Sequence, residues 1–286
     1  MTEPTVIRAS ALTGWPDCPR RGAARLFRKE IEAAGYRLRS PPRGVGAAVG
    51  TAVHNAARLV LDDLARSGTL LPVARAVDVG RDTLADELGR GEILYDETTT
   101  NRPEAFDQVG MMTRAYHRVI APQVRPILVE EKLEANVTPD LVLTGTPDIV
   151  AREPGAIRDT KSGSRPHPGT HAPQIGAYSL LARTRGLEIE VAAVDYLRRV
   201  RSGKPQPDPI SKPVPIAPAE TAATNIIRHI EGDLRTFREG DPARRILPGD
   251  AWSFLANPSS ILCSPKYCSA FGTEFCREGD PAKEST

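Results

Sequence analysis

Three short β-branched segments follow one another between residues 125 and 163, and they constrain the fold more than any other part of the sequence. They read RPILVEEKLEANV (125–137), DLVLTGTPDIVARE (140–153) and GAIRDTKSG (155–163), with Gly or Pro at their boundaries. Segments of this kind are typical of neighbouring β-strands. Helical patterns lie on both sides of them, so the order of elements predicts a mixed α/β core with helices packed on the sheet.

Helical periodicity marks the elements around these strands. Residues 46–66 form the clearest helix, because Ala, Val and Leu recur at three- and four-residue spacing and Gly68 follows. The other expected elements are helices over 171–186 and 218–239, a strand over 189–200, a helical insertion with a mobile centre over 71–121, and an irregular tail from Pro248 onward.

The composition is that of a globular protein. The 286 residues are 40% hydrophobic and 26% charged, with a net charge of +2. No apolar stretch reaches the length of a membrane-spanning helix, and the N-terminus lacks the basic start and apolar run of a secretory signal. We therefore expect a cytoplasmic protein with no membrane partner. Overall charge does not indicate nucleic-acid binding, but the segments 20–43 and 196–204 are locally basic.

Two acids and a lysine occupy these strands. Asp148 lies in the second segment, whereas Asp159 and Lys161 lie in the third, after a Pro154-Gly155 turn. A tight hairpin would bring the carboxylates together, and their repulsion would favour a divalent cation between them. Lys161 faces the same side of its strand as Asp159, where it would orient the attacking water and offset developing charge. Solvated charges beside turns are the alternative interpretation.

Two further features accompany this pattern. His54 lies on the long helix four residues after Gly50, and a lone helical histidine is usually a core or surface residue. Gln174 and Tyr178 are one turn apart on the helix after the third strand, so they share one face. Each feature is unremarkable by itself.

Taken in order, G-x-x-x-H, G-x-x-D, D-x-K and Q-x-x-x-Y resemble the motif series of the PD-(D/E)XK nuclease superfamily, specifically its RecB-like branch. The resemblance implies a restriction-endonuclease-like mixed β-sheet flanked by helices. It also implies a bound Mn²⁺ or Mg²⁺ ion. The implied metal ligands are His54, Asp148, Asp159 and the backbone carbonyl of Thr160; the implied catalytic residues are Asp148, Asp159 and Lys161; and Gln174 and Tyr178 would position the nucleic-acid strand.

Three other side chains are candidates near this site. Glu130 or Glu131, on the preceding strand, is a candidate outer-shell acid, and the residues themselves do not decide between the two. His167 and His171 flank the start of the helix that carries Gln174, where they would contact a phosphate or serve only as loop residues.

The four cysteines are distributed unevenly, with Cys18 near one end and Cys263, Cys268 and Cys276 near the other. Their C-x4-C-x7-C spacing departs from the close pairs of most zinc sites, whereas iron–sulfur clusters need four thiolates and tolerate varied spacing. With the context WPDCPR, the layout resembles the iron–sulfur RecB-like nucleases: AddB and the CRISPR-associated "Cas four" exonucleases with their phage relatives. The resemblance implies a [4Fe–4S] clasp that joins the N- and C-terminal segments.

The resemblance implies a metal-dependent DNA exonuclease that hydrolyses single-stranded ends in recombination, repair or phage DNA processing, in the host cytoplasm if phage-encoded. A recombination, helicase or CRISPR-adaptation partner protein would fit the same context. The expected units are an N-terminal segment (1–45), a nuclease core (46–200) and a C-terminal helix with the three-cysteine segment (201–286). Two alternatives are a catalytically inactive DNA-end-binding adaptor and a zinc-clasped scaffold.

Overall fold

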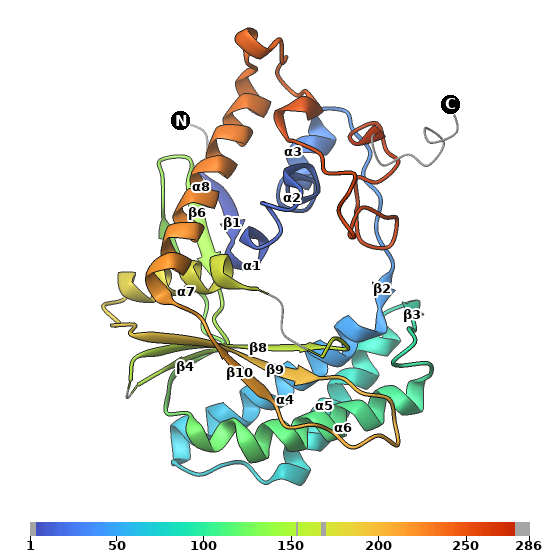
Figure 1. The fold of residues 1–286 in the computed structure, drawn as a ribbon, viewed down its shortest axis with the longest axis vertical. Helices are drawn as coiled ribbons and strands as arrows, with labels where there is room; N and C mark the ends of the chain where they lie inside the picture. Colours follow the sequence, from blue (N-terminus) through green and yellow to red (C-terminus); the bar gives the residue numbers. More distant parts are fainter. Residues whose placement is uncertain (1–3, 153, 167–169, 278–286) are drawn as a thin grey trace.

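The computed structural model describes residues 4–152, 154–166 and 170–277, so the candidate His167 lies outside the described residues. A mixed sheet crosses the middle of the molecule, with helices α4 (Val45–Ser67), α5 (Val73–Gly89) and α6 (Arg102–Val119) on one side and a taller layer containing the described N-terminal and C-terminal segments on the other (Figure 1). The predicted mixed α/β class is confirmed. No helix of the described ranges is long and apolar enough to cross a membrane.

The central sheet has five strands in the order β10-β9-β8-β7-β4. Its strands are Pro126–Val129 (β4), Ile149–Ala151 (β7), Ala156–Gly163 (β8), Val191–Arg198 (β9) and Ile210–Pro213 (β10). β8 and β9 are parallel because helix α7 (Ala172–Thr184) connects them, and the other pairs are antiparallel. The predicted strands over 155–163 and 189–200 and the predicted helix over 171–186 are confirmed to within a few residues.

One face of this sheet is covered by helices α4 (Val45–Ser67), α5 (Val73–Gly89) and α6 (Arg102–Val119). The apolar stripe of α4 is buried in one core with Ile149 of β7 and Leu197 of β9. Gly68 ends α4 with a left-handed φ of 72°, which a residue without Cβ adopts readily. The predicted helix over 46–66 is therefore confirmed.

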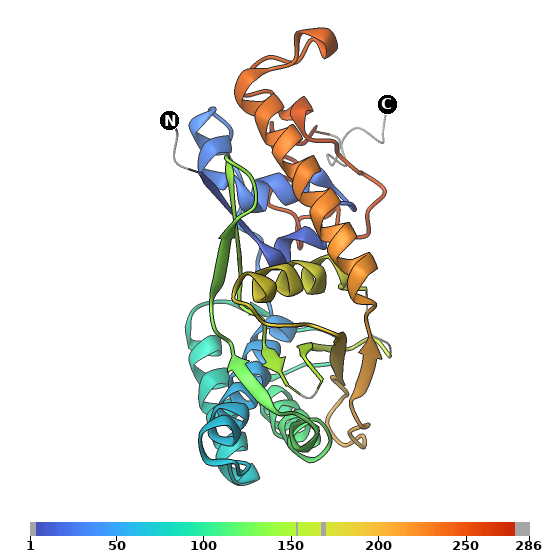
Figure 2. The same ribbon diagram turned by 90° about the vertical axis from the view of Figure 1, so that its left-hand side faces the viewer.

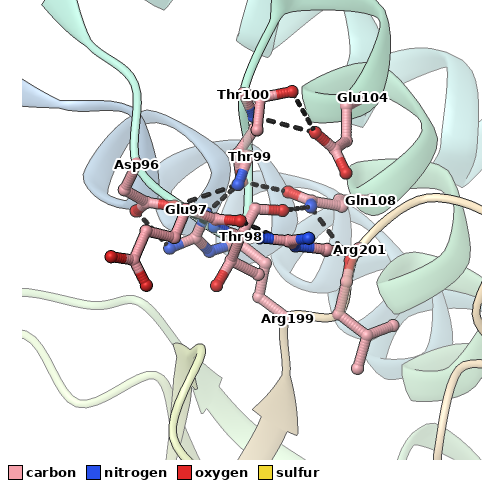
Figure 3. A network of polar contacts seen from close by, with 10 residues as sticks. Asp96, Glu97, Thr98, Thr99, Thr100, Glu104, Gln108, Arg199 and Arg201 are labelled. Carbon is pink, nitrogen blue, oxygen red and sulfur yellow. Dashed lines mark hydrogen bonds and ion pairs between the residues drawn. The ribbon is translucent and has the colours of Figure 1, made fainter.

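The centre of the helical insertion is held by a buried polar network, so its expected mobility has no support in these contacts. Arg199, just past β9, lies 2.6 Å from Asp96, and Gln108 of α6 donates to the carbonyl of Val200 at 2.9 Å (Figure 3). Gln108 also accepts a hydrogen bond from Thr99 at 2.6 Å. These contacts attach the loop between α5 and α6 to the chain just past the C-terminal end of β9, beside the start of α4.

The other side of the sheet carries α7, α8 (Ile216–Glu239) and a three-stranded sheet in the order β1-β6-β5. Its strands are Thr5–Arg8 (β1), Leu133–Asn136 (β5) and Leu141–Gly145 (β6). The predicted strands over 125–137 and 140–153 were each expected to be continuous, and this was wrong. Each one bends and divides between the two sheets, as β4 and β5 and as β6 and β7, so that the hairpin leaves the central sheet (Figure 2).

The two chain ends pack against each other in this second layer (Figure 1). Arg20 is buried, donates from Nε to the carbonyl of Phe254 at 3.0 Å and lies 5.0 Å from the ring of Trp252. Trp15 and Phe27 contact Phe254 edge-on or tilted. The irregular tail predicted from Pro248 is confirmed for the described residues up to 277, apart from the short 3-10 helix Ala251–Ser253 (η3).

The remaining elements are short or peripheral. They are α1 (Ala9–Leu12), α2 (Pro19–Leu26), α3 (Arg28–Ala33), β2 (Arg43–Gly44), β3 (Ile93–Leu94), η1 (Ala121–Gln123) and η2 (Pro242–Arg244).

Candidate active site

The candidate site lies where β6 bends into β7, between the two layers. Asp148 occupies the bend, and the amide of Thr160 on β8 donates to its Oδ2 at 2.6 Å. His54 reaches the same oxygen from α4, with Nδ1 at 3.4 Å. Burial opposes the charge on Asp148, but His54 and Lys161 outweigh it and hold the pKa of Asp148 below its usual value. The Asp148 charge in turn raises the pKa of His54 despite burial.

Asp159 is fully buried on the neighbouring strand. Lys161 Nζ lies 2.5 Å from its Oδ2, as expected for side chains on the same face of a strand. Gln174 donates to Asp159 Oδ1 at 3.2 Å and to the hydroxyl of Tyr178 at 2.8 Å. Burial and the nearby Asp148 carboxylate raise the pKa of Asp159 to about 6. The structure therefore brings Asp148, Asp159 and Lys161 together and fixes one oxygen of Asp159 through α7.

Glu130 is a site residue that the sequence motifs alone did not identify. Ligand atoms of His54, Glu130 and Asp148 all lie within 4.8 Å of one another, and no other such group of three occurs among the described His, Cys, Asp and Glu residues. Burial and the Asp148 charge raise the pKa of Glu130. Asp159 is not part of this tight group. Its carboxylate pairs instead with Lys161, the residue after Thr160.

The donor set suits a hard divalent cation. Two carboxylates and one imidazole, those of Glu130, Asp148 and His54, converge within 4.8 Å of one another, and the buried Asp159 carboxylate lies on the neighbouring strand with its Oδ2 paired to Lys161. Carboxylate oxygens are preferred by Mg²⁺ and Mn²⁺, and an imidazole ligand shifts the preference towards Mn²⁺. A bound cation would relieve the repulsion that is otherwise offset by His54 and Lys161.

The site opens on hollows that carry positive charge. A cavity of about 720 Å³ is lined by Lys161 and Gln174 and, across from them, by arginines of the N-terminal helices: Arg21, Arg25 and Arg28. His171 lines the same cavity, and burial, with help from Lys161 and Lys212, lowers its pKa to about 4. Its imidazole is therefore neutral near pH 7. Tyr178 lines a separate hollow together with Arg8 and Lys132.

The four cysteines meet around one small cavity, although they come from opposite ends of the chain. No disulfide bond joins these four cysteines. Cys18 caps α2, with the amide of Arg21 donating to its Sγ at 3.4 Å, and the amides of Ala270 and Phe271 donate to Cys268. Burial raises the pKa of Cys263 and of Cys268. The cavity is therefore a sulfur-lined site with backbone donors aimed at two of its sulfurs.

Comparisons with known proteins identify the family of this chain and a shared fold. A family model described as the PD-(D/E)XK nuclease superfamily matches residues 9–270. The crystal structure of a "Putative exonuclease" from Eubacterium rectale is similar over 91% of this chain and 87% of that chain, with a TM-score of 0.54 and 10% identity, which shows a shared fold. The structure of SSO0001 aligns over 80% of this chain and 78% of its own, with a TM-score of 0.34 and 12% identity. No curated protein matches the chain significantly.

The raised pKa of Asp159 predicts a pH-dependent stability difference. The carboxyl binds its proton more tightly in the fold than in the unfolded chain, where its pKa is about 3.9. Its contribution to folding is fully present below about pH 4 and is lost as the pH rises through about 6. We therefore expect the free energy of unfolding of Asp159→Asn, relative to wild type, to increase between about pH 4 and pH 7.

Denaturant unfolding in EDTA measures this difference, and Glu131→Gln serves as the control because Glu131 is exposed. A wild-type-to-Asn difference that stays constant over the pH range would contradict the assignment.

Proposed function

The chain belongs to the PD-(D/E)XK nuclease superfamily, and from this premise we propose that it is a DNA exonuclease that hydrolyses phosphodiester bonds from single-stranded ends. Membership makes it a metal-dependent nuclease with DNA as substrate. The observation that carries the finer proposal is the position of Lys161, which pairs with Asp159 and lines a cavity that arginines also line.

His54, Asp148, Asp159 and the carbonyl of Thr160 would hold the Mn²⁺ or Mg²⁺ ion. When bound, the ion supplies Lewis-acid stabilisation and a lowered pKa for attacking water. Lys161 contributes a fixed positive charge where negative charge develops on the phosphoryl oxygens. Gln174 keeps Asp159 in orientation through its hydrogen bond to Oδ1.

The substrate path follows from the positive hollows. The arginines of α2 and α3 line the larger cavity together with Lys161 and Gln174, and Tyr178, to which Gln174 donates a hydrogen bond, lines the second hollow. A nucleic-acid backbone that ran from one hollow to the other would pass Gln174 and Tyr178, the pair expected to position the strand. Phosphate contacts of this kind are electrostatic and do not depend on base sequence.

Cleavage of end-labelled single-stranded DNA tests the proposed activity. With Mn²⁺ or Mg²⁺, we expect wild type to degrade the strand and Lys161→Ala to lose at least about 100-fold in rate, as when one preorganised charge partner is removed. Lys204→Ala is the matched control, because Lys204 is exposed and lines none of the cavities at the site. The fate of the label reports the polarity of cleavage.

The same assay separates the proposal from its rival. Wild-type protein that binds the strand without cutting it in either metal would instead be a catalytically inactive DNA-end-binding adaptor. Retention of His54, Asp148, Asp159 and Lys161 in one arrangement supports the enzyme.

The salt dependence of binding tests the substrate path. Arg21 and Arg28 are paired with Asp17 and Glu32 at 2.7 Å, whereas Arg25 is exposed at the cavity. We expect Arg25→Ala to weaken DNA binding and to reduce the slope of log K against log salt by about 0.7, the value for one contact to single-stranded phosphate. Replacing Arg21 and Arg28 as well should reduce the slope further.

Arg66→Ala controls for the loss of one surface arginine, because Arg66 is exposed at the far end of α4. If replacing Arg21, Arg25 and Arg28 together left the slope of log K against log salt unchanged, the proposed substrate path would be contradicted.

We also propose that Cys18, Cys263, Cys268 and Cys276 hold a [4Fe–4S] cluster that fastens the chain ends together. A single tetrahedral zinc with Zn–S of about 2.3 Å places sulfurs about 3.8 Å apart. The four thiols share a cavity, yet they form no group of three within 4.8 Å among the described residues. This wider spacing supports a cluster over one zinc ion, and amides that donate to the sulfurs are common around such clusters.

Metal analysis tests the clasp in protein purified without oxygen. We expect about four iron atoms per chain, lost in Cys268→Ser but kept in Asp148→Asn, because the two sites are separate. The contacts of Arg20 and Phe254 also join the ends, so the serine variant should become protease-sensitive in the C-terminal segment without unfolding the nuclease core. Zinc in place of iron would support the zinc-clasped scaffold.

A further inference from the structure

The backbone places Glu130 unusually close to Asp148. Glu130 follows β4 and has a φ of 46°, one of two positive φ values among the described non-glycine residues. Its amide donates to the carbonyl of Asp148 at 3.1 Å, so the bends after β4 and before β7 lie side by side. Glutamate has no intrinsic preference for this left-handed region, and strained residues of this kind concentrate at functional sites.

The strained backbone directs the Glu130 carboxylate towards His54 and Asp148, with which it forms the tight group of ligand atoms. Two carboxylates at this distance repel each other unless a cation lies between them. The nearest arginine does not fully supply that charge. Arg58 lies 3.7 Å from Glu130 but is hydrogen-bonded to Asp62 at 3.0 Å and to Asn55 at 3.0 Å.

The neighbouring Glu131 provides the contrast. It is exposed, and its carboxylate lies 3.8 Å from Arg185 of the loop after α7. The two adjacent glutamates therefore differ in surroundings: one belongs to the group around His54 and the other to the surface.

We propose that Glu130 is a carboxylate ligand of the divalent cation, on the side of the site that His54 and Asp148 share. The inference rests on the proposed function, since it assigns a further ligand to the same metal. Glu130 lies outside the four sequence motifs and reaches the site only because the hairpin bends. The bound ion would then connect both bends, β4 to β5 and β6 to β7.

Mn²⁺ binding, measured by titration calorimetry without DNA, tests the ligand directly. Glu130→Gln preserves the shape of the side chain and removes its charge, and we expect Mn²⁺ affinity to fall by about 10- to 100-fold. Glu130→Asp retains a carboxylate and should lose less, whereas Glu131→Gln should bind like wild type. The rise in melting temperature that Mn²⁺ causes should be smallest in Glu130→Gln, intermediate in Glu130→Asp and equal to that of wild type in Glu131→Gln.

A second readout distinguishes a ligand from a merely structural residue. DNA cleavage by Glu130→Gln should recover as Mn²⁺ is raised, whereas cleavage by Lys161→Ala should not. Equal melting temperatures of the metal-free wild type and Glu130→Gln would show that the fold is retained, and if that variant fails to fold, Glu130→Asp carries the comparison.

The possible outcomes separate the inference from the function on which it rests. Wild-type Mn²⁺ affinity in Glu130→Gln would overturn the inference and leave the nuclease intact. Equal losses in Glu130→Gln and Glu131→Gln would also overturn it, because they would reflect general surface charge. A wild-type protein that binds no Mn²⁺ and cuts no DNA would overturn both.

Discussion

The bend between β6 and β7 is the constraint on which the rest of the structure depends. A Cβ on Gly145 would lie 2.9 Å from the side chains of Tyr178 and Leu181, so only glycine allows α7 to pack against the strand at this point. Three residues later, Asp148 accepts the Thr160 amide with its side chain and the Glu130 amide with its backbone. The same bend thus joins the two sheets and places the Asp148 carboxylate against β8.

Several charges are buried at this bend, and their repulsion both destabilises the metal-free site and favours the binding of a cation there. Asp148, Asp159 and Glu130 are partly or fully desolvated, and His54 and Lys161 offset only part of their repulsion. Desolvated like charges cost free energy, and proteins keep such arrangements where a ligand supplies the missing charge. A cation bound here is therefore expected to stabilise this part of the core.

The two layers contribute different functions to one site. The helical layer supplies His54 and attaches its insertion through Arg199, whereas the layer with the chain ends supplies the arginines and the sulfur-lined cavity. Arg21 connects the last two, because it lines both the large cavity and the cysteine cavity. The proposed clasp would accordingly hold Arg21 at the large cavity that Lys161 also lines. Loss of the cluster would therefore be expected to weaken substrate binding.

The sequence by itself determined the elements and the chemistry of this protein. Local patterns were enough for both elements: apolar periodicity for the helix of His54, and a β-branched segment between Gly or Pro boundaries for the strand of Asp159 and Lys161. The order of the four motifs was enough to indicate the nuclease superfamily. Only the tertiary structure decided how the β-branched segments divide between two sheets, since the polar residues at 130–132 and 144–148 do not specify which sheet each half joins. It also distinguished Glu130 from Glu131 and showed the insertion loop held by Arg199, because these facts depend on contacts between segments far apart in the chain.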